Sequence, residues 1–381
     1  MDSIVSRMLA AYGVSRRVFG VYILPVFAAW MFLNIRIAVA IGMALDNVFF
    51  PSLRKVGKPK PIVLVGNPRT GTTFLQRYLA DHGYGAGMQI WRMLYPSLTM
   101  QVFIKPILPL LEIVSPAKYH STPAHQTSLS SVETDDVGVL FRHFDGFFLY
   151  GFFMSFAEEE MKEQFDPNAR GTNERDFAWL DELWRRSIVA QDLERPIAKL
   201  FSLGPRTPEF LEAYPDAHIL YMARDPVSIL PSAMSLVSGV LENAFSFSKL
   251  DDEIQRRWYK RMYGGLVDLL QRFTDDWNSG RIDRDRVYVV RYDRMMGEFE
   301  VVMDEIHTFL GVEATEAQKK AAIDRGEKQR AYKSGHKYDL AKYHLDADQI
   351  RKDCAFFYET FLPDLEPKPE AQPEPEENAA S

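Results

Sequence analysis

Two short segments of the chain carry the residue types that bind phosphate groups. The first, residues 66–73 (GNPRTGTT), has two glycines at the spacing of the phosphate-binding loop GxxxxGK[ST]. Small residues let backbone N–H groups close around an anion, and the amino end of a following helix adds a favourable dipole. The lysine of that pattern is missing, because Thr72 stands in its place and the base is Arg69. The loop therefore suits a compact oxyanion and is poorly equipped for a nucleoside triphosphate with magnesium.

The second segment, residues 221–232 (YMARDPVSILPS), places Ser232 eight residues after Arg224. An arginine offers a planar fork to a phosphate, and a serine one to two turns into the following helix adds a hydroxyl. The alternative is a surface ion pair of Arg224 with Asp225 or another acid. The two segments together predict a site that grips two phosphate groups.

Both segments follow predicted strands, which positions them in the fold. The apolar runs at 61–65, 196–201, 218–222 and 287–291 indicate strands, and residues 256–277 and 299–310 show helical spacing, the latter closed by Gly311. Strands that alternate with helices are typical of a parallel sheet covered on both faces. We therefore predict an α/β fold in which both segments lie at strand ends.

The two phosphate-binding segments resemble motifs of a known protein family. Residues 68–79 (PRTGTTFLQRYL) are similar to the 5′-phosphosulfate loop of sulfotransferases that use 3′-phosphoadenosine 5′-phosphosulfate (PAPS), and Arg224 with Ser232 is similar to their 3′-phosphate motif. The resemblance spans residues 60–362, and the apolar N-terminal head is similar to that of the bacterial branch. It implies one P-loop-kinase-like domain with a central parallel sheet of about five strands covered by helices.

The resemblance also implies roles for individual residues. PAPS would be the co-substrate, and no metal would be required. Arg69 would neutralise the leaving phosphate. The groups expected to bind PAPS are Arg69, Thr70, Gly71, Thr72, Thr73, Arg224 and Ser232.

A general base must take the proton of the acceptor. Residues 119–136 hold the candidates, which resemble a His followed by an acidic cluster in the bacterial branch. Glu133 is the first choice, since burial can raise the pKa of a carboxyl into a useful range, and His125 is the second. Lys199 would stabilise the bridging oxygen, or it is a surface lysine. The predicted catalytic residues are Glu133, His125 and Lys199.

The acceptor itself cannot be read from the sequence. It would be a small molecule or a lipid with a hydroxyl or amine group. The aromatic stripe at residues 141–156 could line an apolar acceptor pocket, although core packing is the favoured interpretation. Two other functions stay open, namely a P-loop ATP or GTP enzyme and a non-catalytic, membrane-tethered nucleotide-binding protein.

Composition narrows the class of protein. The chain has 381 residues, 46% hydrophobic and 25% charged, which is typical of a folded globular protein. A net charge of −7 argues against a nucleic-acid partner. The single cysteine, Cys354, excludes an internal disulfide and multi-cysteine zinc sites, and favours a reducing compartment.

Charge divides the chain into three pieces. Residues 1–60 carry eight bases and two acids, and residues 364–381 carry six acids and one base. We expect a basic, apolar helical segment at 1–60, a sulfotransferase domain at 61–363 and a disordered acidic tail at 364–381.

The head has no charged residue from 18 to 35, and Pro25 would kink a helix there. A single membrane span, a helix pair in the membrane interface and an apolar hairpin docked on the body all fit. We expect a membrane surface as a partner and a location on the cytoplasmic side of a membrane. The oligomeric state is left open.

Overall fold

The computed structural model describes residues 3–115, 127–331 and 340–365. Its centre is a five-stranded sheet in the order β2 (Ala86–Gly87), β3 (Pro196–Lys199), β1 (Ile62–Val65), β4 (His218–Ala223) and β5 (Val287–Arg291). All neighbouring strands are parallel, and Ile62 lies opposite both Ile197 and His218. The predicted α/β class and parallel sheet are confirmed. The strand predicted at 196–201 is shorter than expected, because a 3-10 helix, η5 (Phe201–Arg206), begins there.

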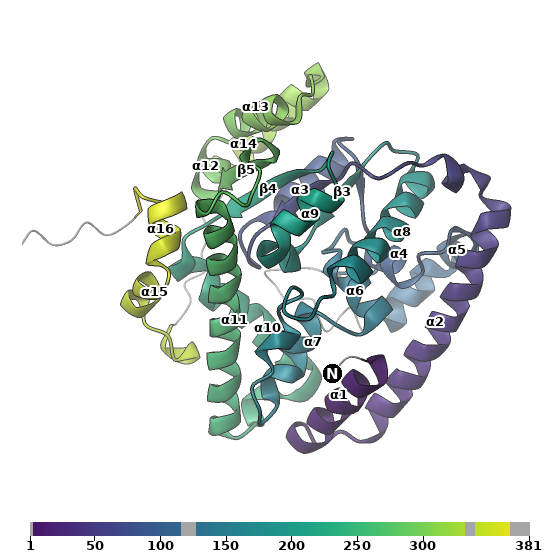
Figure 1. Ribbon diagram of the computed structural model, residues 1–381, viewed down its shortest axis with the longest axis vertical. Coiled ribbons are helices and arrows are strands. Elements are labelled where there is room, and N and C mark those ends of the chain that lie inside the picture. The colour runs from purple at the N-terminus through teal and green to yellow at the C-terminus, as the bar shows by residue number, and fades with distance from the viewer. Residues whose placement is uncertain (1–2, 116–126, 332–339, 366–381) are drawn as a thin grey trace, which may run out of the picture.

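The two faces of the sheet bury alternate residues of each strand. Ile62 and Leu64 face a core formed with α3 (Thr72–Asp81), α12 (Tyr292–Gly297), α13 (Phe299–Leu310) and α14 (Glu316–Ala331). Val63 and Val65 face the larger core, to which α8 (Asn173–Gln191), α9 (Thr207–Ala213), α10 (Pro226–Phe245), α11 (Asp252–Asn278) and α16 (Ala355–Phe361) contribute. Figure 1 shows α12 to α14 at one end of the molecule, with the long α11 running away from the sheet. The sheet is therefore covered on both faces, as parallel sheets require.

Shorter elements complete the described part of the chain. They are η1 (Pro51–Lys55), α4 (Ile90–Leu94), α6 (Asp136–His143), α7 (Phe147–Phe152), η3 (Met154–Phe156), η4 (Lys162–Gln164), η6 (Phe247–Lys249), η7 (Arg284–Arg286), η8 (Ala341–Tyr343) and α15 (Ala347–Asp353). Asp364, at the start of the predicted tail, pairs with Arg291 at 2.8 Å. Residues 366–381 lie outside the described residues.

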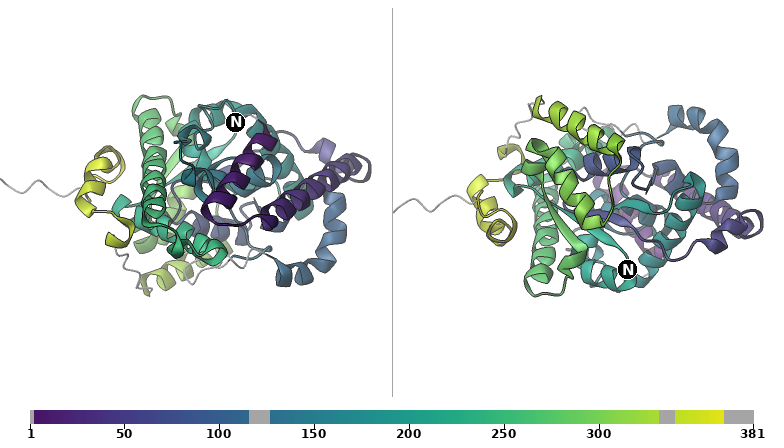
Figure 2. Two further views of the ribbon diagram at one scale, coloured as in Figure 1. Left: turned by 90° about the horizontal axis from the view of Figure 1, so that it is seen from below. Right: turned by 90° about the horizontal axis from the view of Figure 1, so that it is seen from above.

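The N-terminal segment is helical, as predicted. It forms α1 (Ile4–Val18) and the long α2 (Ile23–Phe49), which packs against α5 (Leu98–Val114) along one edge of the molecule (Figure 2). The kink expected at Pro25 is wrong, because Pro25 is the third residue of α2 and lies in the first turn, where backbone N–H groups have no intrahelical partner to lose. By length and composition alone, α2 and α10 are long and apolar enough to cross a membrane. In the most apolar 18 residues of each helix, 6% are buried in α2 and 44% are buried in α10.

The aromatic side chains of the stripe at residues 141–156 lie in the core or pack against it. Phe147, Tyr150 and Phe156 are buried there. From the head, Phe19 packs edge-on against Phe156 at 5.0 Å and stacks on Phe245 at 4.4 Å. These aromatic side chains therefore attach the N-terminal segment to the body.

Candidate active site

The loop between β1 and α3 turns tightly beneath the sheet edge. Gly66 and Gly71 have φ angles of +145° and +94°, which favour glycine. A Cβ at Gly66 would lie 2.9 Å from the carbonyl oxygen of Met222, and one at Gly71 would lie 2.7 Å from Cε of Met295. The two glycines therefore let the loop approach β4 and α12 closely, and Gly71 leads directly into the amino end of α3.

Side chains inside the loop hold its shape. The Thr70 hydroxyl donates to the carbonyl of Asn67 at 2.8 Å, and the Asn67 amide donates to the carbonyl of Leu266 on α11 at 2.9 Å. Both Asn67 and Thr70 are buried. The backbone N–H groups that open α3 are therefore presented from a fixed turn, which is the geometry that binds anions.

The two phosphate-binding segments meet at this loop. Nε of Arg69 donates to the hydroxyl of Ser232 at 2.9 Å, and Nη1 of Arg224 donates to the carbonyl of Arg69 at 2.6 Å. The Arg224 guanidinium lies 3.8 Å above the ring of Tyr292, which follows β5. Residues that are far apart in the chain thus come together because their strands, β1, β4 and β5, end at the same edge of a parallel sheet.

Asp225, the nearest acid in sequence to Arg224, is directed elsewhere. Its carboxylate caps α10 by accepting from the backbone of Val227 at 3.1 Å and from the hydroxyl of Ser228 at 2.7 Å. The Tyr358 hydroxyl donates to the same carboxylate. Asp225 thus fixes the start of α10 and, with it, the place of Ser232.

A chain of polar contacts joins α3 to β3 and to the segment before α6. Nζ of Lys199 donates to the Thr73 hydroxyl at 2.8 Å and lies 3.4 Å from Oε2 of Glu133. Oε1 of Glu133 pairs with Nη2 of Arg77 at 2.7 Å. Lys199 is 1% exposed and Glu133 is 6% exposed. Lys199 is therefore not a surface lysine, and Glu133 is held between two cations at the edge of the loop.

The electrostatics of this cluster follow from burial. Desolvation lowers the pKa of Lys199, and the nearby Glu133 carboxylate opposes that shift. Burial raises the pKa of Asp135 to about 7, although its carboxyl accepts hydrogen bonds from the backbone of Lys199 at 2.9 Å and from Trp184 at 2.8 Å. Asp135 ties the segment that carries Glu133 to the end of β3, and so positions Glu133 beside Lys199.

The structure thus brings most of the predicted site residues to one place. Arg69 to Thr73 form the loop and the start of α3, and Arg224, Ser232, Lys199 and Glu133 surround it. His125 lies outside the described residues.

Two contributors were missed from the sequence. Arg77 lies one turn after Thr73 on α3, a spacing that puts both on one face of the helix, and Tyr292 follows the fourth predicted strand as Arg224 follows the third. The spacing on the helix and the shared place after a strand are the signals that could have found them.

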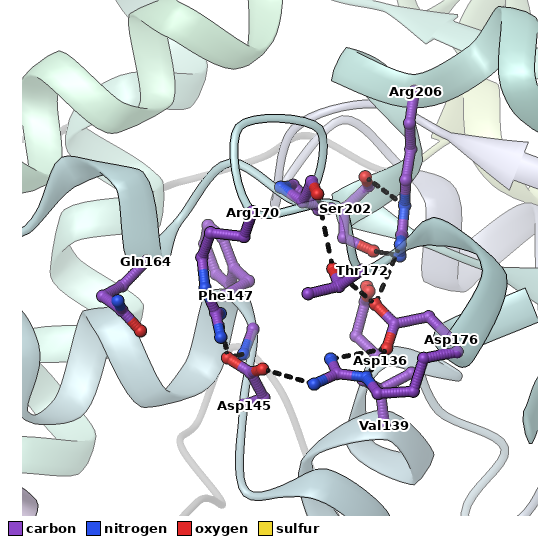
Figure 3. A pocket seen from close by; sticks show the side chains of 13 residues that line it. Asp136, Val139, Asp145, Phe147, Gln164, Arg170, Thr172, Asp176, Ser202 and Arg206 are labelled. Carbon is purple, nitrogen blue, oxygen red and sulfur yellow. Dashed lines mark hydrogen bonds and ion pairs between the residues drawn. The ribbon is translucent and has the colours of Figure 1, made fainter. Parts of the chain in front are cut away.

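A small pocket lies beyond the segment after Glu133, next to Asp136 and Ser202 (Figure 3). Its charged side chains bind one another: Asp145 pairs with Arg175 at 2.9 Å and with Arg170, and Asp176 pairs with Arg206 at 2.9 Å. This network of ion pairs supports α6 and α8. Among the described residues, no group of three His, Cys, Asp or Glu side chains is placed to hold a metal ion.

Comparison with known proteins shows the family of the chain and the similarity of its fold to solved structures. The model of the sulfotransferase family matches residues 61–316. The chain belongs to the sulfotransferase family. Its fold is similar to that of the sulfotransferase STF1 from Mycobacterium tuberculosis H37Rv, with a TM-score of 0.66, 16% identity, and coverage of 92% of this chain and 91% of that one. It is also similar to the sulfotransferase STF9 from Mycobacterium avium, with a TM-score of 0.59, 18% identity, and coverage of 84% and 81%. No curated protein matches the sequence.

Proposed function

We propose that this sulfotransferase moves a sulfuryl group from PAPS to a hydroxyl or amine acceptor. The observation that carries the proposal is the contact of Arg224 and Ser232 with Arg69, because it joins the two segments that would hold the two ends of PAPS. The residues fit such a ligand. A glycine-containing turn, the amino end of α3 and the cations Arg69, Lys199 and Arg224 surround one place, as a donor with a phosphosulfate and a 3′-phosphate requires.

The phosphosulfate would lie on the loop. Backbone N–H groups at the start of α3 and the hydroxyls of Thr72 and Thr73 would bind its oxygens, while Arg69 and Lys199 supply positive charge. Arg224 and Ser232 would bind the 3′-phosphate, with Tyr292 holding the guanidinium plane in place. Catalysis by this arrangement is positioning and charge stabilisation.

In the transfer step, the acceptor oxygen or nitrogen forms a bond to sulfur as the bond from sulfur to the bridging phosphate oxygen breaks. The bridging oxygen keeps the electron pair and leaves with 3′,5′-ADP (PAP), and Lys199 stabilises its new charge. The acceptor proton goes to the Glu133 carboxylate. Pairing with Arg77 and Lys199 favours the ionised form of Glu133, which is the form that can accept a proton.

Calorimetric titration with PAP tests the proposal. The wild type should bind PAP, and Arg224→Ala should weaken binding by about 10- to 150-fold, since one charge-assisted contact to a phosphate contributes roughly 1.5–3 kcal/mol. Arg256→Ala is the matched control, because Arg256 is an exposed arginine of α11 paired with Asp252. Binding of magnesium–ATP without binding of PAP would instead support a P-loop ATP enzyme, and binding of neither would refute the proposed donor.

A further inference from the structure

The helices α2 and α5 carry a large apolar surface, which we call the apolar face. Figure 2 shows the two helices at the edge of the molecule, away from the sheet. The large hydrophobic side chains exposed on this face are Ile23, Leu24, Val26, Phe27, Trp30, Met31, Leu33, Ile37, Ile41, Leu45, Val48, Phe49, Val102, Phe103, Ile107, Leu110, Ile113 and Val114. An exposed apolar surface of this extent, on two helices that pack against each other, marks an interaction site.

The apolar face is almost free of charge. The two charged residues of α2 turn inward: Asp46 is fully buried and pairs with Arg186 at 2.9 Å, while Arg36 is partly buried and lies against the ring of Phe32. On α5, Glu112 bonds to the backbone of the following loop, so Lys105 is the one exposed charge on the two helices. The exposed polar side chains of α2, Asn34 and Asn47, donate to carbonyls of their own helix, those of Trp30 at 2.7 Å and Met43 at 3.3 Å, which lowers the cost of placing them in hydrocarbon.

Both ends of α2 are fastened to the same body. On one side, α1 is anchored by Arg7, which donates to the carbonyls of Phe144 at 2.9 Å and His143 at 2.8 Å. On the other side, Asp46 binds Arg186 of α8 and the backbone N–H of Thr99 at 2.8 Å. A helix of 27 residues is about 40 Å long, enough to span a bilayer. Its ends would then lie on opposite sides of the membrane, which their attachment to one body forbids.

Basic residues flank the apolar face. Arg16 and Arg17 are exposed just before α2, and Arg54 and Lys55 are exposed just after it. Asp46 is the single acid between residues 3 and 60, and it is buried. This charge pattern matches an anionic membrane surface, with Trp30 and Phe27 suited to its interfacial layer.

We propose that the apolar face lies in one leaflet of a membrane, on the cytoplasmic side, with both ends of α2 in the cytoplasm. The protein is then bound to one side of the bilayer and does not cross it.

The carboxyl end of α5 is bound to the segment that carries Glu133. At the end of α5, the Glu112 carboxylate accepts from the backbone N–H groups of Leu129 at 3.0 Å and Ser130 at 2.9 Å. Ser130 is three residues before Glu133, a separation of at most about 11 Å along the chain. An amphiphile with its apolar chain in the leaflet can therefore bring a hydroxyl at the membrane surface toward Glu133. Resting on the proposed function, this assigns the acceptor as a membrane lipid with a hydroxyl or amine head group.

Flotation with vesicles tests the docking surface. The full chain should float with vesicles of phosphatidylcholine and phosphatidylglycerol, and less with phosphatidylcholine alone. Trp30→Glu with Phe103→Glu should reduce the floating fraction at least tenfold, because carboxylates are costly in the acyl region. The control is Val301→Glu with Ile323→Glu, which changes two exposed apolar residues on α13 and α14 and should float like the wild type. Wild-type protein that stays unbound, or that forms a dimer dispersed by the first pair of substitutions, would overturn the proposal.

Labelling tests the topology. Cysteines introduced as Arg16→Cys and Ser52→Cys flank α2 at exposed positions. In inside-out membrane vesicles from cells that make the full chain, a membrane-impermeant maleimide should label both, and in right-side-out vesicles neither. Labelling of only one position in each preparation would show a spanning helix and contradict the proposal.

The acceptor is tested with PAPS labelled in sulfur and a cell extract divided into lipid and water-soluble fractions. Label should enter the lipid fraction, at least tenfold faster with wild-type protein than with the Trp30→Glu, Phe103→Glu variant. Label in the water-soluble fraction, or in neither fraction from protein that binds PAP, would refute a lipid acceptor and leave the donor site intact. Protein that fails to bind PAP would refute the proposed function itself, while the flotation result would still stand or fall independently.

Discussion

The buried pair of Lys199 and Glu133 provides a sharp test of the site. Replacing Lys199 with Met keeps most of the side-chain volume and removes one of the two cations that pair with Glu133, the other being Arg77. Removing one partner of a buried ion pair costs about 3–5 kcal/mol. The surviving contact to Arg77, whose side chain is 35% exposed, places the expected loss at the lower end, about 3 kcal/mol in the free energy of unfolding.

Urea denaturation measures this loss, with Lys260→Met on the exposed side of α11 as the control that should change stability by less than about 0.5 kcal/mol. Adding Glu133→Gln to Lys199→Met should recover part of the lost stability, because the buried carboxylate that had lost a cation is then replaced by a neutral amide. Each single substitution should also lower kcat for sulfuryl transfer by at least about 100-fold, since the proposed roles of both residues are in the transition state. Unchanged stability in Lys199→Met, with additive effects in the double variant, would refute the pairing.

Two further predictions concern the loop and the segment before α6. Gly71→Ala should weaken PAP binding at least tenfold in calorimetry and destabilise the fold by about 1–3 kcal/mol, because Gly71 has a φ of +94° and a Cβ there would contact Met295. The control is Gly264→Ala, since a Cβ at Gly264 in α11 would lie in open space. Equal PAP affinity in both variants would contradict the loop geometry. The pKa of Asp135 is raised from 3.8 to about 7 in the folded state, so between these values the folded protein keeps a proton that the unfolded chain has lost. The free energy of unfolding therefore falls as the pH rises through this range. Between pH 5.5 and 8 the free energy of unfolding of the wild type should fall by about 2 kcal/mol through this group. Asp135→Asn lacks the titrating carboxyl, so its stability relative to the wild type should rise by that amount over the same pH range. A difference between the two proteins that does not change with pH would show that Asp135 is ionised throughout.

The sequence was informative where local chemistry and fold agree. The loop at 66–73 follows a strand and opens a helix, so its place at the sheet edge could be predicted, and the Arg224 segment follows another strand in the same way. Strand β2 escaped prediction because two residues, Ala86 and Gly87, carry no periodic pattern.

Other features depend on contacts distant in sequence. The burial of Lys199 and its pairing with Glu133 arise from packing of the segment before α6 against β3, and the sequence showed only that both residues were chemically suitable. The sequence also left three arrangements open for the head. Attachments through Arg7 and Asp46, each to residues more than a hundred positions away, dock the head on the body, and no local pattern contains that information.

The central claim is that two segments of this chain hold the two ends of one doubly phosphorylated adenosine. The structure of the complex with PAP tests it most directly. We predict the 5′-phosphate on the loop at residues 69–73 and the 3′-phosphate within hydrogen-bonding distance of Arg224 and Ser232. A nucleotide bound elsewhere, or a 3′-phosphate that Arg224 does not reach, would contradict the account.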